Sequence, residues 1–273
     1  MTATLLISRK ELRDAIRSRW LLAFALTFAA LALVISRVQS DAGGIGDQGF
    51  NRTTAGLINL CLLLVPLLSL LLGAGAIAGE RERGTLSTLL SQPISSTNLL
   101  IGKYIGLAVA IWCALAGGFG VAGLLVSLFE PMTDVGHYLL FVGLSAALAC
   151  AMLSTGILVS VLAESRAKAL GVAILLWFFF VLAYDLGAIA FALAVSSSGR
   201  ALTAVALLNP VESVRLLAVM SIEPDLEILG PLGSYLSETL GTRGSTGLLA
   251  AAVAAWTAVP LAIAARVLSR QDA

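Results

Sequence analysis

Charged side chains are scarce in this sequence. Only 12% of its 273 residues are Asp, Glu, Lys or Arg, whereas 59% are hydrophobic, and the mean hydropathy is +0.97. A chain with so little charge is unlike an ordinary soluble domain, so the composition indicates an integral membrane protein. The sequence also has no basic stripe with interleaved aromatic residues, which argues against nucleic-acid binding.

The sequence lacks most groups that would support chemistry of its own. Its three cysteines, Cys61, Cys113 and Cys150, lie in apolar runs without Cys-x-x-Cys spacing, so we expect them to be buried as small apolar side chains. His137 is the single histidine, and we expect it at the surface and not in a metal site. There is no Gly-x-x-x-x-Gly-Lys-Ser/Thr loop to hold ATP phosphates. We therefore expect no catalytic residue, metal or cofactor in this chain, and paired aspartates or a membrane-embedded histidine for intramembrane proteolysis are absent from the sequence.

The sequence is instead dominated by long apolar runs. About 20 helical residues cross a hydrocarbon core of about 30 Å, and six runs are long enough or nearly so. We predict an all-α integral membrane protein with one transmembrane domain over residues 1–273. The predicted spans are 20–35, 57–79, 99–128, 138–163, 169–195 and 246–267.

The distribution of basic residues predicts the orientation. Basic residues are retained in the cytoplasm during insertion, and twelve of the 17 Lys and Arg residues fall on one side of the predicted spans. That side holds both termini, so we expect cytoplasmic termini in the cell inner membrane. The first run follows five cations without a cleavage pattern, which favours a retained span over a signal peptide. The twelve are Arg9, Lys10, Arg13, Arg17, Arg19, Arg81, Arg83, Lys103, Arg166, Lys168, Arg266 and Arg270, and the five are Arg37, Arg52, Arg200, Arg215 and Arg243.

Two segments outside the spans carry helical patterns. Residues 1–19 are predicted to form an interfacial helix with Leu5, Leu12 and Ile16 on its apolar face and most cations opposite, near lipid headgroups; an extended basic segment is the alternative. The largest external segment is 196–245.

Within this external segment, Asn209 is a capping residue, Pro210 stands at the first helical position and Glu212 at the third. This combination predicts the start of an amphipathic helix on the outer membrane surface. The segment either docks an external partner or closes the outer end of the bundle. Asn209, Pro210, Glu212 and Arg215 are the candidate residues for a partner contact or gate.

A polar segment from Glu80 to Ile94 separates the second and third spans and belongs to a loop over residues 80–98. Gly84 and Thr85 open a short predicted helix with leucines on one face, and residues Glu80 to Arg83 would keep the preceding turn solvated. A short helix that exposes leucines is typical of a segment that docks into the groove of a soluble partner. The candidate contact residues are Glu80, Glu82, Gly84, Thr85, Leu86, Leu89, Leu90, Ser91, Pro93 and Ile94.

The pattern Glu-x-x-x-Gly-Thr-Leu, followed by Leu-Leu-Ser-x-Pro-Ile-Ser and then Gly102-Lys103, resembles the coupling region of ABC-2 type transporter permeases. The six spans, Tyr184-Asp185-Leu186 and Leu208-Asn209-Pro210-Val211-Glu212 are similar to NosY-like permeases, which serve nitrous-oxide-reductase maturation. The resemblance implies that the short helix docks into a cytoplasmic NosF-like ATPase that binds ATP and Mg. It also implies two copies of the chain, a periplasmic NosD-like partner, and a role in assembly of a copper-sulfur centre.

Two other functions are compatible with the sequence. The chain could transmit movement to an external protein without transporting a solute. Alternatively, Asp185, an acidic residue well inside an apolar run, could be the centre of an ion-coupled secondary transporter. A proton, a cation or a partner Arg would be the reason for an ionisable group there. Its position roughly 25 Å along a helix from Lys168 instead favours a structural hydrogen bond near the outer interface. Gly117, Gly118 and Gly120 are expected to permit close helix approach.

Overall fold

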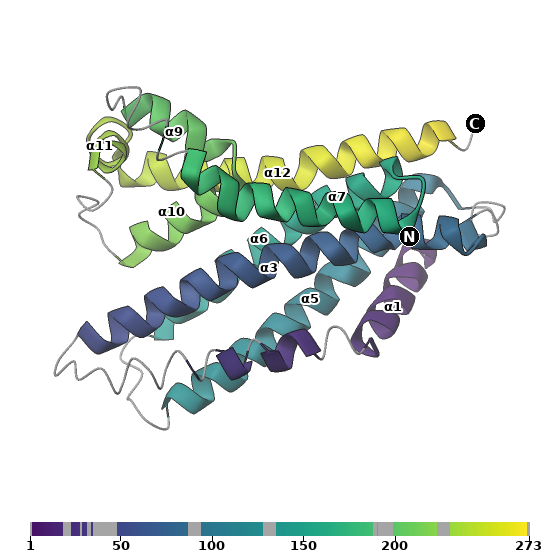
Figure 1. Cartoon of the computed structure of the whole chain (residues 1–273), viewed down its shortest axis with the longest axis horizontal. Coiled ribbons are helices and arrows are strands. Elements are labelled where there is room, and N and C mark those ends of the chain that lie inside the picture. Colours follow the sequence, from purple (N-terminus) through teal and green to yellow (C-terminus); the bar gives the residue numbers. More distant parts are fainter. Residues whose placement is uncertain are drawn as a thin grey trace.

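The computed structural model describes residues 2–18, 23–27, 29–31, 34, 48–86, 94–127, 135–187, 190, 199–222 and 230–271. All regular structure in these residues is helical, which confirms the predicted class (Figure 1). The elements are α1 (Thr2–Ile16), α3 (Gln48–Glu82), α5 (Ser96–Ser127), α6 (Val135–Leu162), α7 (Arg166–Phe178), η1 (Phe179–Ala183), α9 (Gly199–Leu207), α10 (Pro210–Ile222), α11 (Gly230–Ser234), η3 (Tyr235–Thr239) and α12 (Gly241–Gln271).

Five described helical segments are long and apolar enough to cross a membrane, and they correspond to the second through sixth predicted spans. The first predicted span, 20–35, lies mostly outside the described residues. A sixth candidate is the pair α9 and α10, which are bent by 119° and together form a broken span or a re-entrant hairpin. The five segments are Ile58–Glu82, Ser96–Leu124, Val135–Leu162, Arg166–Gly187 and Gly241–Arg270.

Helices α3 and α6 pack backbone to backbone in the core because glycine lets them approach closely. A Cβ atom placed on Gly73 would lie 2.7 Å from the carbonyl oxygen of Leu153, and one on Gly156 would lie 2.6 Å from that of Leu70. Gly117 and Gly120 of the third predicted span were expected to permit close helix approach. This expectation is wrong within the described chain, since a Cβ at either position meets nothing within 4 Å. Helix α7 and helix α12 pack around this centre and expose more of their surfaces.

The bundle has two ends, which we call the loop end and the hairpin end. The loop end holds α1, the C-terminal end of α3, the start of α7 and the C-terminal end of α12, whereas α9, α10 and α11 gather at the hairpin end (Figure 1). The described start and end of the chain therefore lie at the same end of the molecule.

Helix α1 confirms the prediction of a helix near the N-terminus and packs along α5. A Cβ at Gly102 would lie 2.9 Å from Ile7 Cβ, and one at Gly106 would lie 2.5 Å from the Ser8 carbonyl oxygen. Leu12 packs against the core, whereas Leu5 is exposed. The face buried by α1 is therefore fixed by the two glycines of α5 in addition to its own apolar residues.

Helix α10 begins where the sequence predicts but does not lie on the surface. Val211, Val214, Leu216 and Ala218 are each 1% exposed, and the helix contacts α3, α6, α9 and α12. The expectation of a surface amphipathic helix is wrong, because bundle helices cover α10 on several sides.

Candidate functional site

The predicted coupling segment starts where α3 ends at the loop end. Gly84 has φ +70°, a left-handed conformation that suits glycine and ends the helix, and its N–H donates to the Arg81 carbonyl oxygen at 3.1 Å. The chain is helical again at Thr85, whose Oγ1 donates to the Glu80 carbonyl oxygen at 3.3 Å. This hydrogen bond holds the new turn against the end of α3.

The centre of the segment, residues 87–93, lies outside the described residues, and with it the candidates Leu89, Leu90, Ser91 and Pro93. Of the described candidates, Leu86 is 9% exposed and packs in the core, and Ile94 is half-buried. The exposed described candidates are Glu82, Gly84 and Thr85.

Glu11, Glu80 and Lys103 form a buried cluster at the base of this segment, which we call the ion triad. Lys103 Nζ lies 2.7 Å from Glu11 Oε1 and 2.7 Å from Glu80 Oε1. The side chains are 3% (Lys103), 5% (Glu80) and 14% (Glu11) exposed. Since they come from α5, α3 and α1, the ion triad joins three helices, and Lys103 neutralises one of two carboxylates that burial would otherwise leave unpaired.

The ion triad overturns one expectation from the sequence. Glu80 was expected to stay solvated, but it is 4% exposed as a residue and directed at Lys103. Its Oε2 atom is buried without a hydrogen bond from the described residues. The signal available in the sequence was Lys103, a cation near the start of an apolar run, which needs a buried partner if its helix packs inside the bundle.

Two further side chains tie the end of α3 to the turn between α6 and α7. The Arg81 guanidinium donates to the carbonyl oxygens of Val161, at 3.3 Å, and Ala163. Glu82 Oε2 accepts from the backbone N–H of Arg166 at 3.1 Å, at the first residue of α7. Hence a movement of the last turn of α3, from which the coupling segment continues, would pull directly on α1, α5, α6 and α7.

The turn itself continues this polar network toward solvent. Ser165 caps α7, with its Oγ accepting from the Lys168 backbone N–H at 3.3 Å. Lys168 Nζ pairs with Glu164, and this hydrogen bond lowers the pKa of the exposed Glu164 carboxyl below its usual value. Both side chains are more than half exposed, so this pair contributes little to stability.

A second polar cluster, which we call the hairpin cluster, contains Asp185, Glu212 and Arg215. Arg215 binds Asp185 in a bidentate manner, with Nη1–Oδ1 and Nη2–Oδ2 distances of 3.1 and 3.0 Å. Its Nη1 also lies 2.8 Å from Glu212 Oε2. A partner Arg is one of the reasons expected for Asp185, and Arg215 of α10 is that Arg. The cluster fixes α10 to the segment that follows η1.

Asn209 links the start of α10 to η1 through uncharged hydrogen bonds. Its Oδ1 accepts from the Val211 backbone N–H at 2.9 Å, as a helix cap does, and its Nδ2 donates to the Phe180 carbonyl oxygen at 2.7 Å. Phe180 lies in the π-helical segment η1, where the backbone register is shifted. The Trp256 ring of α12 packs edge-on against Phe180, with ring centroids 5.5 Å apart. Asn209 and Pro210 are both buried and act inside the bundle.

The cysteines and the histidine differ in their exposure. Cys61 is buried and Cys150 half-buried, but Cys113 is exposed, so the expectation of burial is wrong there. His137 is exposed, as predicted. No group of three or more His, Cys, Asp or Glu side chains with a metal-binding arrangement occurs among the residues described.

A family model and two similar proteins all indicate an ABC transporter protein. The family model described as "ABC-2 family transporter protein" matches residues 5–273. A protein named "Probable ABC transporter permease protein NosY" from Pseudomonas aeruginosa PAO1 is 37% identical over 270 residues, covering 94% of each chain. A protein of the same name from Stutzerimonas stutzeri is 36% identical over 235 residues, covering 83% of this chain and 84% of its own.

Proposed function

The chain belongs to the ABC-2 family of transporter proteins, as a NosY-like permease subunit, and from this premise we propose that the segment after α3 couples it to a separate cytoplasmic ATPase. Two copies of the chain would form the membrane core. The ATPase would bind ATP and Mg, and its closure would push on the segment between Glu80 and Ile94. Both termini and the loop end would face the cytoplasm, in the cell inner membrane.

The observation that carries this proposal is the connection of the segment to the bundle. Its base is held by the ion triad, by Arg81 and by Glu82, which together reach α1, α5, α6 and α7. A loop attached only by its backbone would absorb a push by bending. One anchored by buried charge contacts transmits it, because breaking such contacts is costly.

We expect Leu89→Asp to uncouple the transporter. A carboxylate placed on the predicted leucine face would oppose docking into an apolar groove, so the ATPase should copurify less well and its hydrolysis should no longer support function. The measurement is the amount of ATPase retained on the tagged permease, together with activity in cells. Thr97→Asp is the matched control, since Thr97 is exposed in the first turn of α5, where a negative charge is favourable. Normal association and activity of Leu89→Asp would refute the coupling assignment.

Both relatives are named NosY, and we infer that this chain serves the maturation of nitrous oxide reductase. In it, the permease would work with a NosF-like ATPase and a periplasmic NosD-like protein in assembly of the copper-sulfur centre of nitrous oxide reductase. The hairpin end would face that periplasmic partner. A pull-down from native membranes that yields an ATPase and a periplasmic protein supports this arrangement, and recovery of the permease with neither would contradict it.

An alternative is that the same movement is passed to the external partner without transport of a solute. This version fits the hairpin cluster, because Asp185, Arg215 and Asn209 join α10 to η1 and to the residues that follow η1, which continue directly from α7. A shift of α7 would therefore carry the hairpin with it. Transport assays in vesicles with both partners present separate the two versions.

The ion-coupled alternative depends on Asp185 being the site of a transported ion. Both oxygens of its carboxylate accept from Arg215, which supports a structural role over an ion site. We expect Asp185→Asn to keep ATP-dependent function at a substantial fraction of the wild-type level, since Glu212 still holds Arg215. Complete loss of function in this variant, together with full function when the ATPase is inactivated, would favour ion coupling.

A further inference from the structure

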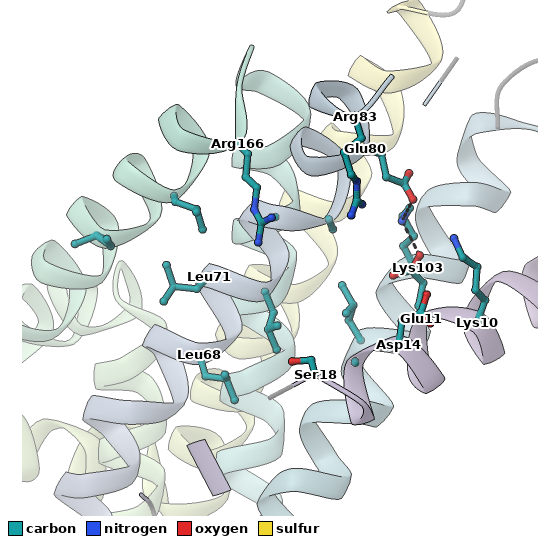
Figure 2. A pocket seen from close by; sticks show the side chains of 17 residues that line it. Lys10, Glu11, Asp14, Ser18, Leu68, Leu71, Glu80, Arg83, Lys103 and Arg166 are labelled. Atoms are coloured by element: carbon teal, nitrogen blue, oxygen red, sulfur yellow. Dashed lines mark hydrogen bonds and ion pairs between the residues drawn. The ribbon is translucent and has the colours of Figure 1, made fainter. Parts of the chain in front are cut away.

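A pocket of about 530 Å³ opens at the loop end between α1, α3, α5 and α7 (Figure 2). Its volume is within the range of small-molecule sites. One wall of the pocket is apolar and includes Leu68, Leu71 and Ile174, while the part around Glu80 and Lys103 is polar. Figure 2 shows Arg166 and Arg83 reaching toward the same space, above Leu71 and Leu68. An occupant should therefore have an anionic head and an apolar tail.

The charges of the lining favour a single negative charge on the ligand. Four basic and three acidic side chains line the pocket, which leaves a net charge of +1. Lys103 is neutralised within the ion triad. The basic groups that stay available in the described structure include Arg83 and Arg166, both exposed residues. Two guanidinium groups directed at one space suit a phosphodiester, which accepts hydrogen bonds from such forks.

Arg166 is positioned by the surface of α3. A Cβ atom at Gly79 would lie 3.7 Å from Arg166 Cδ, and one at Gly75 would lie 4.0 Å from its Nε. The side chain thus runs along two glycines, and its backbone N–H is bound to Glu82. These contacts place the Arg166 side chain along α3, beside the pocket.

The depth of the pocket matches one leaflet of a bilayer. Twelve residues of α3 separate Leu68 from Glu80, which is roughly 18 Å along a helix at about 1.5 Å per residue. Half of a hydrocarbon core of about 30 Å is about 15 Å. The polar part of the pocket thus lies at headgroup level when the apolar wall lies in the acyl region.

We propose that this pocket binds one anionic glycerophospholipid, phosphatidylglycerol, with its phosphate on Arg166 and Arg83 and an acyl chain along Leu68 and Leu71. The bound lipid would fill the space between α1 and α7 beside the ion triad. This site is independent of the ATPase assignment, because every group in it belongs to this chain and the lipid.

Native mass spectrometry of the full chain in micelles tests the proposal by titration with phosphatidylglycerol, phosphatidylethanolamine or inorganic phosphate. We expect retention of phosphatidylglycerol over the other two. Arg166→Gln should weaken it about fivefold, as expected for one basic group at a lipid surface. Lys168→Gln is the matched control, since Lys168 lies two residues away, is exposed and does not line the pocket.

A second pair of variants leaves all charges in place. Gly75→Leu would fill the pocket beside Arg166, because a Cβ there has only ordinary contacts, and should abolish retention of the lipid. Gly117→Leu, at a position where a Cβ meets nothing within 4 Å, should retain it.

Four results would overturn the proposal. Two concern the ligand: retention of phosphatidylethanolamine, or of inorganic phosphate, equal to that of phosphatidylglycerol. The other two concern the variants: the same affinity for phosphatidylglycerol in Arg166→Gln and Lys168→Gln, or unchanged retention of phosphatidylglycerol in Gly75→Leu. If Gly75→Leu also converts a dimeric mass to a monomeric one while lipid retention is unchanged, the pocket receives a second copy of the chain and not a lipid.

Discussion

At the residue scale, Lys103 makes the contacts whose loss we expect to be most costly. Lys103→Met removes the ammonium that lies between Glu11 and Glu80 and leaves two carboxylates in a buried site. Breaking a buried ion cluster by removing one partner costs about 3–5 kcal/mol. The free energy of unfolding should fall by that order, measured as a lower denaturation midpoint of the purified protein in detergent.

The same site offers a rescue that separates charge from packing. When Glu11→Gln and Glu80→Gln are combined with Lys103→Met, no unpaired charge remains, and most of the lost stability should return. Lys168→Met is the control, because its exposed pair with Glu164 is expected to contribute little to stability. If Lys103→Met is no less stable than Lys168→Met, the ion triad does not hold the loop end together.

At the element scale, the contact between α3 and α6 depends on Gly156. Gly156→Ala would place a Cβ 2.6 Å from the Leu70 carbonyl oxygen, and a helical backbone cannot yield as a side-chain end can. The two helices must move apart, and overpacking of this kind costs about 1–3 kcal/mol. Gly143→Ala on the same helix meets nothing within 4 Å and should be neutral or stabilising by up to about 1 kcal/mol. Equal melting temperatures for the two variants would show that the α3–α6 contact is not limited by glycine.

The elements also show how far the sequence could predict the structure. Apolar runs predict the five described spans, and Asn209 with Pro210 predicts the start of α10, because both signals are local. Which glycines lie at a close contact between helices cannot be predicted from the local sequence. Gly117 looks equivalent to Gly73 in sequence, and only the position of the neighbouring helix distinguishes them.

Which polar residues pair with each other likewise cannot be predicted from the local sequence. A buried Lys needs a carboxylate, but the sequence offers several, and Glu11 is 92 residues from Lys103 along the chain. Asp185 is similar, since Arg215 becomes its partner only when the hairpin folds back against the segment after η1. The types of these residues were informative, whereas their pairings required the arrangement of helices.

At the scale of the whole molecule, the loop end and the hairpin end are connected by continuous helices. Helix α3 carries Glu80 of the ion triad at one end, and α10 packs against both α3 and α6 near the other. The α3–α6 contact is too close to slide freely, since backbone meets backbone at Gly73 and Gly156. A push at the loop end should thus move the pair as a unit and reach the hairpin end.

The direction of such a push depends on which end faces the cytoplasm, and the charge distribution predicts that it is the loop end. Twelve of 17 basic residues belong to the segments on that side, and basic segments are retained in the cytoplasm. We expect Thr97→Cys and Ser269→Cys, exposed at the loop end, to react with a membrane-impermeant maleimide only after cells are permeabilised. Glu238→Cys, exposed at the hairpin end, should react in intact cells, with all three variants made in a chain lacking Cys61, Cys113 and Cys150. Labelling of Ser269→Cys in intact cells would reverse the orientation, and an ATPase could then not act on the segment after α3.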